Sequence, residues 1–120
     1  MDAPKLHHEQ LDVYRAAVEF LGLAARFAEG FPRGYAGLSD QLRRASLSVP
    51  LNIAEGYGKR STADRRRFYD IARGSAHECG AVLDAARTLG FGDERSFVEA
   101  KPLLVRIVSM LVKMSKPRDA

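Results

Sequence analysis

The feature that most constrains the fold is a regular spacing of apolar and small residues between positions 68 and 89. These residues recur at alternating intervals of four and three: Phe68, Ala72, Ser75, Cys79, Val82, Ala86 and Leu89. Because an α-helix has 3.6 residues per turn, this spacing places all of them on one side of a long helix. Such a side needs another helix to cover it, so the pattern predicts a helical bundle.

Three other segments have the same periodicity, and no segment alternates as a half-buried β-strand does. Two adjacent apolar stripes mark the first segment: Leu11, Tyr14, Val18, Leu21, Ala25 and Ala28, and Val13, Ala17, Phe20, Ala24 and Phe27. The second contains Leu38, Leu42, Ala45, Val49 and Ile53, and the fourth contains Phe97, Leu104, Ile107, Leu111 and Met114. We therefore predict helices near residues 8–29, 38–57, 62–90 and 94–115.

Turn and capping residues separate these four segments. The expected N-caps are Ser39, Ser61 with Asp64 three residues later, and Asp93. The residues expected to end helices are Gly56, Gly58, Gly90 and Gly92. Pro50 and Pro102 fall inside the helical patterns, so each predicts a kink or a helix start. Short connections favour antiparallel neighbours, so we predict an all-α, antiparallel up-and-down four-helix bundle.

The length and the cysteine content bound the class of protein. A chain of 120 residues is expected to form a single domain, here residues 1–120. Cys79 is the only cysteine, so no internal disulfide can form and a reducing compartment is expected. The N-terminus lacks the pattern of a signal peptide, and no apolar run approaches the ~18 residues of a membrane span. We expect a cytoplasmic protein with no membrane association.

The positive charge is concentrated in the middle of the chain. The formal net charge is +4, and residues 41–73 hold eight basic and three acidic side chains. The basic residues are Arg43, Arg44, Lys59, Arg60, Arg65, Arg66, Arg67 and Arg73. A basic cluster attracts polyanions, so these eight are candidates for binding RNA or DNA. The alternative is a solvated basic helix face, on which Asp64 and Asp70 pair locally with the arginines.

A catalytic or metal site is not predicted. His77, Glu78 and Cys79 are adjacent, but neighbours on a helix point about 100° apart and do not converge. Cys79 lies on the apolar side, where a thiol is inert. With one cysteine and no His-x-x-x-His spacing, no set of metal ligands is evident. We expect a protein without a catalytic activity or a cofactor.

Polar residues on the second and third segments suggest a junction between two helices. Asn52 and Glu55 share a side with apolar residues, and Gly74, Ser75 and Glu78 form a matching set on the third segment. A glycine lets another helix come close, so we predict hydrogen bonds between the two sets. Two ordinary solvated faces remain the alternative.

These residues also resemble a known family. The motif Asn52-Ile53-Ala54-Glu55-Gly56, the stretch Lys59-Arg60-Ser61, and Ile71-Ala72-Arg73-Gly74-Ser75 with Glu78 are similar to the four-helix bundle proteins, also called ribosomal RNA intervening-sequence proteins. The resemblance implies an up-and-down bundle that assembles into a homo-oligomeric ring, typically a pentamer. A related type in that family assists the reverse transcriptase of diversity-generating retroelements and binds nucleic acid, so a reverse transcriptase is one implied partner.

Two functions therefore stay open. The first is a homo-oligomeric accessory protein that binds nucleic acid through the basic cluster, although no nucleic-acid-reading motif is present and Phe68 and Tyr69 are interpreted as core residues rather than base-stacking platforms. The second is a protein-interaction scaffold. The double apolar stripe of the first segment is wider than one bundle needs, which favours an interface with another copy.

Overall fold

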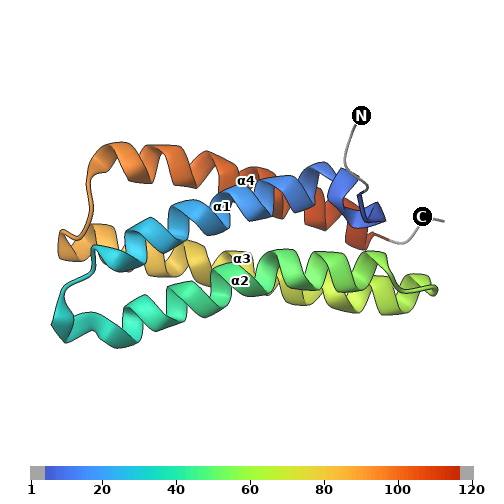
Figure 1. Cartoon of the computed structure of the whole chain (residues 1–120), viewed down its shortest axis with the longest axis horizontal. Coiled ribbons are helices and arrows are strands. Elements are labelled where there is room, and N and C mark those ends of the chain that lie inside the picture. The colour runs from blue at the N-terminus through green and yellow to red at the C-terminus, as the bar shows by residue number, and fades with distance from the viewer. Residues whose placement is uncertain (1–4, 117–120) are drawn as a thin grey trace.

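The computed structural model describes residues 5–116, which form four long helices lying side by side (Figure 1). They are α1 (Asp12–Glu29), α2 (Ala36–Tyr57), α3 (Thr62–Leu89) and α4 (Glu94–Ser115). Two short 3-10 helices, η1 (His7–Gln10) and η2 (Arg33–Tyr35), precede α1 and α2. None of the described residues lies in a β-strand, so the predicted all-α class is confirmed.

The helices pack as a square of antiparallel neighbours. Each contacts the next in the sequence, and α1 closes the square against α4. Within residues 5–116, no Cα atom of α2 comes within 8 Å of a Cα atom of α4, because these two helices occupy opposite corners. The α2–α3 turn, the start of α1 and the end of α4 lie at one end of the bundle, and the α1–α2 and α3–α4 connections lie at the other (Figure 1).

The core follows the predicted apolar sides of all four helices, except that Leu89, predicted on the covered side of α3, is 46% exposed at the end of that helix. Its largest fully buried apolar side chains are Phe20, Leu42, Ile53, Ile107, Leu111, Val49 and Cys79. Of the two stripes on α1, the one that contains Phe20 is buried, whereas Val18 on the other stripe is 44% exposed. The width of the apolar face on α1 thus exceeds what the bundle covers.

The helix boundaries differ from the prediction mainly at two starts. The first helix begins at Asp12 rather than residue 8, because Leu11 is extended and separates η1 from α1. The second begins at Ala36, so Ser39 is not its N-cap; the Ser39 hydroxyl donates to the carbonyl of Ala28 (3.1 Å) and ties α2 to the end of α1.

The caps predicted at Gly58, Ser61, Gly90 and Asp93 are confirmed, whereas the helix end predicted at Gly56 is not. Ser61 accepts a hydrogen bond from the backbone N–H of Asp64, and Asp93 accepts one from that of Ser96. The hydrogen bonding from Ser96 holds the pKa of Asp93 below its ordinary value. Gly90 ends α3 with a φ of 81°, a left-handed conformation that glycine adopts readily. Gly56 does not end α2, because the helix continues to Tyr57 and Gly58 is its C-cap.

Neither proline starts a helix. Pro50 lies inside α2 and Pro102 inside α4. At each position the carbonyl four residues earlier loses its usual N–H partner.

Candidate nucleic-acid interface

The α2–α3 turn is held in shape by backbone and capping bonds on both sides. Gly58 follows the last residue of α2, and its N–H donates to the carbonyl of Ala54 (3.2 Å). The Ser61 hydroxyl then caps α3 at a distance of 3.0 Å from the nitrogen of Asp64. Because the end of α2 and the start of α3 are both held by hydrogen bonds, the backbone that carries the basic residues of the turn and of early α3 is fixed.

Five of the predicted basic residues lie at this turn or in the first two turns of α3: Lys59, Arg60, Arg65, Arg66 and Arg67. We call them the basic end. Lys59, in the turn, pairs with Glu55 in the last turn of α2 (3.3 Å). Among the described residues, the four arginines form no ion pair with a carboxylate, and Asp64 pairs with none of them. Their charge is therefore available to a ligand.

The other three predicted residues lie elsewhere. Arg73 pairs with Asp70 on α3 (3.8 Å), as the local-pairing alternative expected. Arg43 and Arg44 are exposed and lie fifteen or more positions before Lys59 on the chain. At 1.5 Å per helical residue this places them roughly 20 Å from the turn. The structure thus divides the set of eight into one cluster and three separate cations.

Aromatic rings at the basic end contact cations instead of being free for bases. Lys59 and Arg67 both lie over the ring of Phe68, with distances of 5.2 and 5.0 Å to its centroid. Arg65 lies 5.4 Å from the centroid of Tyr57. Tyr69 is buried, and desolvation raises the pKa of its hydroxyl. These contacts orient the cations, because a cation over a ring face is attracted by the ring quadrupole.

A cavity of about 220 Å³ opens at the same end of the bundle. It is lined by Tyr57, Thr62, Arg65, Arg66, Tyr69, Met114 and Lys116. The sequence interpretation did not include Lys116 or Tyr57 in this site. The predicted up-and-down topology was sufficient to place Lys116 here, because it brings the C-terminal end of α4 beside the start of α3.

Among the described residues, neither Asn52 nor Glu55 forms the predicted hydrogen bond to α3, and other polar residues join the two helices. The hydroxyls of Ser48 on α2 and Ser75 on α3 are 2.7 Å apart. Asn52 donates to the carbonyl and the hydroxyl of Ser48, each at 2.9 Å, so it supports the junction from within α2. Nearer the start of α2, Gln41 donates to Glu78 (3.0 Å). The prediction missed two polar residues of α2. Ser48 lies one turn before Asn52, and Gln41 lies about three turns before it.

Two members of the predicted junction are placed differently. Glu55 is exposed and its carboxylate pairs with Lys59 instead of α3. A Cβ added to Gly74 would meet nothing within 4 Å, so no helix approaches it. The close approach occurs at Gly56, where an added Cβ would lie 2.9 Å from the Cβ of Phe68. Gly56, not Gly74, is the glycine that helix packing requires.

The adjacent residues His77, Glu78 and Cys79 diverge, as the helical geometry predicted. His77 lines a surface cavity between α3 and α4, Glu78 reaches α2, and Cys79 is in the core. Burial, with a smaller contribution from Glu78, raises the pKa of the Cys79 thiol to about 12. The thiol is therefore protonated at neutral pH and poorly nucleophilic.

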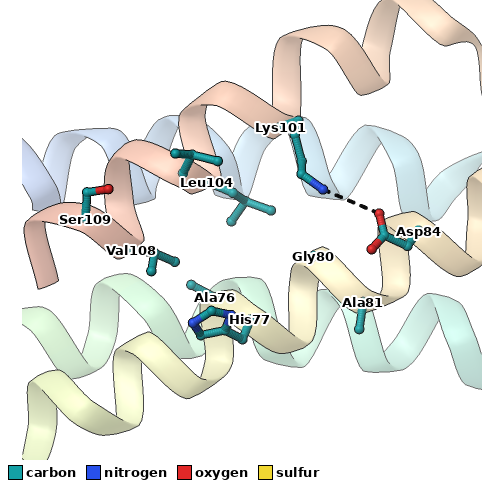
Figure 2. A pocket seen from close by; sticks show the side chains of 10 residues that line it. Ala76, His77, Gly80, Ala81, Asp84, Lys101, Leu104, Val108 and Ser109 are labelled. Atoms are coloured by element: carbon teal, nitrogen blue, oxygen red, sulfur yellow. Dashed lines mark ion pairs between the residues drawn. The ribbon is translucent and has the colours of Figure 1, made fainter. Parts of the chain in front are cut away.

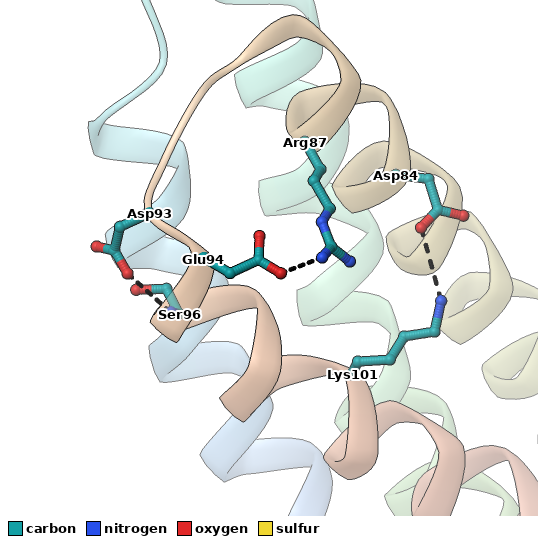
Figure 3. Close-up of polar contacts among 6 residues, drawn as sticks. All are labelled: Asp84, Arg87, Asp93, Glu94, Ser96 and Lys101. Atoms are coloured by element: carbon teal, nitrogen blue, oxygen red, sulfur yellow. Dashed lines mark hydrogen bonds and ion pairs between the residues drawn. The ribbon is translucent and has the colours of Figure 1, made fainter.

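The cavity beside His77 is larger, about 400 Å³ (Figure 2). Small residues of α3, Ala76, Gly80 and Ala81, form its floor, and Leu104 and Val108 of α4 face them. An ion pair between Asp84 and Lys101 (3.6 Å) spans the cavity at one end. Beyond it, Arg87 pairs with Glu94 at the start of α4 (Figure 3). Paired charges hold this side of the bundle together.

Residues 5–116 contain no group of three or more His, Cys, Asp or Glu side chains placed to hold a metal ion. No helix in this part of the chain is long and apolar enough to cross a membrane.

Together the four antiparallel helices and the short connections between them define an up-and-down four-helix bundle. Residues 9–113 match the family of 23S rRNA-intervening sequence proteins, and the chain belongs to that family.

Among solved structures, the chain is similar to a protein of unknown function from the S23 ribosomal protein family of Bacteroides thetaiotaomicron. The TM-score is 0.80 at 20% sequence identity, over 88% of this chain and 99% of the other. At this identity the likeness shows a shared fold. No curated protein matches the chain.

Proposed function

We propose that the protein is a homo-oligomeric accessory factor that binds RNA or DNA through the basic end. The observation that supports this most is the absence of carboxylate partners at Arg60, Arg65, Arg66 and Arg67 among the described residues. Repulsion among arginines without counter-charges lowers the free energy of unfolding only slightly, but the same charges attract phosphates strongly.

The mode of recognition follows from the side chains present. Phe68 and Tyr57 are engaged by cations, and no base-reading motif accompanies them. Phosphate contacts position a nucleic acid, whereas base contacts specify its sequence. Binding at this end is therefore sequence-tolerant and sensitive to salt.

Assembly is supported by two exposed apolar patches on opposite corners of the bundle. The α2 patch comprises Leu47 and Leu51 of α2, 46% and 58% exposed, with the exposed Val18 of α1 and Ile71 of α3. The α4 patch comprises Val98 and Val105, 61% and 55% exposed, with the half-buried Val112. Leu47 and Leu51 lie opposite to the buried Val49 and Ile53 of α2, and Val98 and Val105 lie opposite to the buried Ile107 of α4.

Two different patches that face away from each other favour a head-to-tail contact. The α2 patch of one copy then covers the α4 patch of the next, and such heterologous contacts close into a ring when the rotation permits. A pentameric ring, as the family resemblance implies, repeats the basic end five times. Linked sites raise the overall affinity without any new contact, so avidity replaces a recognition motif.

The second function, a protein-interaction scaffold, is favoured by the cavity between α3 and α4. Its small-residue floor and the facing Leu104 and Val108 suit an apolar segment of a partner protein, such as a reverse transcriptase. The lone, buried Cys79 accords with a cytoplasmic location for either function.

A binding titration separates the two functions. Generic single-stranded RNA and duplex DNA are titrated into the protein at about 50 and 200 mM salt, a range over which several phosphate contacts change the affinity by orders of magnitude. The nucleic-acid function predicts binding that weakens steeply across this range for both ligands. An oligomer with no affinity at the lower salt concentration leaves only the scaffold.

A further inference from the structure

We infer that the cavity at the basic end is a subsite for a terminal phosphate monoester of a nucleic-acid strand. This inference rests on the proposed nucleic-acid function and names the group that the cavity holds. Three cationic residues, Arg65, Arg66 and Lys116, line the cavity, and no carboxylate is among its lining residues. By contrast, the cavity beside His77 and three other surface cavities on residues 5–116 each have at least one Asp or Glu in their lining.

The hydrogen-bonding state of the two arginines points to an anion. The Nε of Arg66 is buried and has no partner among the described residues. A buried polar nitrogen without a partner costs free energy, and a shift of the Arg66 side chain toward the cavity would let a bound phosphate oxygen accept its hydrogen bond. Arg65 donates its Nε to the carbonyl of Lys59 (2.7 Å), so its position is fixed while its terminal nitrogens remain for a ligand.

The composition of the cavity favours a phosphate rather than a base. The ring of Tyr57 already has Arg65 at 5.4 Å and the ring of His7 at 5.0 Å, so a nucleobase that stacks on Tyr57 competes with these two neighbours. The hydroxyl of Thr62, in the first turn of α3, adds a neutral donor. The N-terminal end of that helix also favours negative charge.

A chain end suits this site better than an internal phosphodiester. A monoester bears about −1.5 to −2 charges at neutral pH, and it offers three oxygens to donors, whereas a diester bears one charge and offers two. A volume of about 220 Å³ at the tip of the bundle is small for a strand that enters and leaves. Arg60 and Arg67, the two other arginines of the basic end, then contact the phosphates that follow the terminal one.

The test compares oligonucleotides that differ only at one end. A single-stranded RNA with a 3′ fluorophore is prepared with either a 5′-phosphate or a 5′-hydroxyl, and the dissociation constant of each is measured by fluorescence anisotropy. An oligonucleotide with a 3′-phosphate and a 5′ fluorophore shows which end supplies the monoester. The cavity predicts that a phosphorylated end binds about tenfold tighter, the factor expected for one further charge-assisted hydrogen bond.

Variants tie the preference to the cavity. Lys116→Gln and Arg66→Gln should reduce the preference to near unity, and the exposed position of Lys116 makes its variant safe for folding. Arg60→Gln is the matched control, because Arg60 belongs to the basic end but does not line the cavity. It should weaken the binding of both oligonucleotides equally and leave their ratio unchanged.

The possible failures are distinguishable. Binding of both oligonucleotides with equal affinity overturns the terminal-phosphate subsite and leaves the proposed function intact. If neither binds, the proposed function fails, and inorganic phosphate then decides the subsite. Phosphate at matched ionic strength should raise the melting temperature of the wild type more than that of Lys116→Gln; an equal shift overturns the subsite as well.

Discussion

Gly56 of α2 packs directly against Tyr69 of α3: a Cβ added to Gly56 would lie 2.9 Å from Cε1 of the tyrosine ring. The same atom would meet the Cβ of Phe68 at 2.9 Å. Because the Cβ of Phe68 belongs to a helix backbone that cannot simply rotate away, α2 and α3 must separate to admit a side chain.

Gly56→Ala should therefore lower the free energy of unfolding by about 1–3 kcal/mol, the usual cost of overpacking a tight contact. Gly74→Ala is the matched control, because its Cβ enters open space on α3. It should stabilise the protein by up to about 1 kcal/mol through helix propensity. Chemical denaturation of both variants measures the difference, and equal effects would contradict the described helix contact.

The polar junction predicts unequal roles for two neighbours on α2. Asn52→Ala removes the two bonds to Ser48 and should cost about 1 kcal/mol of stability. Glu55→Ala removes an exposed pair with Lys59 and should change stability by less than about 0.5 kcal/mol. Thermal or urea unfolding decides between them. A larger loss for Glu55→Ala would mean that its carboxylate has a partner outside the single subunit.

The sequence predicted contacts between neighbours on the chain better than contacts between distant segments. The spacing of Phe68, Ala72 and Cys79 sufficed for α3, and short-range capping by Ser61 and Asp93 located two helix starts. It did not locate the start of α2, because the extra residues from Ala36 have no apolar periodicity.

The same holds for the candidate nucleic-acid interface: residues close in the sequence were predicted together, and distant ones were not. Lys59 to Arg67 are close in the sequence and therefore close in space. Lys116 joins them only through the antiparallel return of α4, and Arg43 separates from them only because α2 is straight enough to place it far along the bundle. Residue spacing within one segment does not encode either distance.

Cys79 should be unreactive in the folded protein. Its thiol is fully buried, and burial raises its pKa to about 12, so no thiolate is available at pH 8. A colorimetric thiol reagent should label the protein only after guanidinium is added. Rapid labelling in native buffer would show that α3 opens locally.

The same shift predicts a pH dependence of stability. The unfolded thiol ionises near its ordinary value of 9.0, whereas the folded thiol resists ionisation up to about 12. The contribution is therefore complete below pH 9 and is lost as the pH rises from 9 toward 12, because the thiolate favours the unfolded chain. Stability of Cys79→Ala should decline less steeply over this range than that of the wild type. Equal declines in stability with pH for the two proteins would contradict the raised pKa of Cys79.

The two apolar patches predict a specific outcome when variants are mixed. Leu51→Arg disables the α2 patch and Val105→Arg disables the α4 patch, so each variant alone should be monomeric. An equimolar mixture should form a dimer, because one copy retains an intact α4 patch and the other an intact α2 patch. Leu89→Arg is the control, since Leu89 is exposed but lies outside both patches. Light scattering gives the masses; a monomeric wild type would remove the assembly proposal.

The most direct measurement of the central claim compares two variants that lose the same charge at opposite ends of the bundle. Arg60→Gln with Arg67→Gln alters the basic end, and Arg26→Gln with Arg33→Gln alters the end near the α1–α2 connection. Affinity for a generic single-stranded RNA is measured at several salt concentrations. The first variant should bind at least about tenfold more weakly, and the slope of log affinity against log salt should fall by about 0.7 per lost phosphate contact. The second should bind like the wild type. Equal losses in both variants would mean that net charge alone attracts the RNA, and would contradict a binding site at the α2–α3 turn.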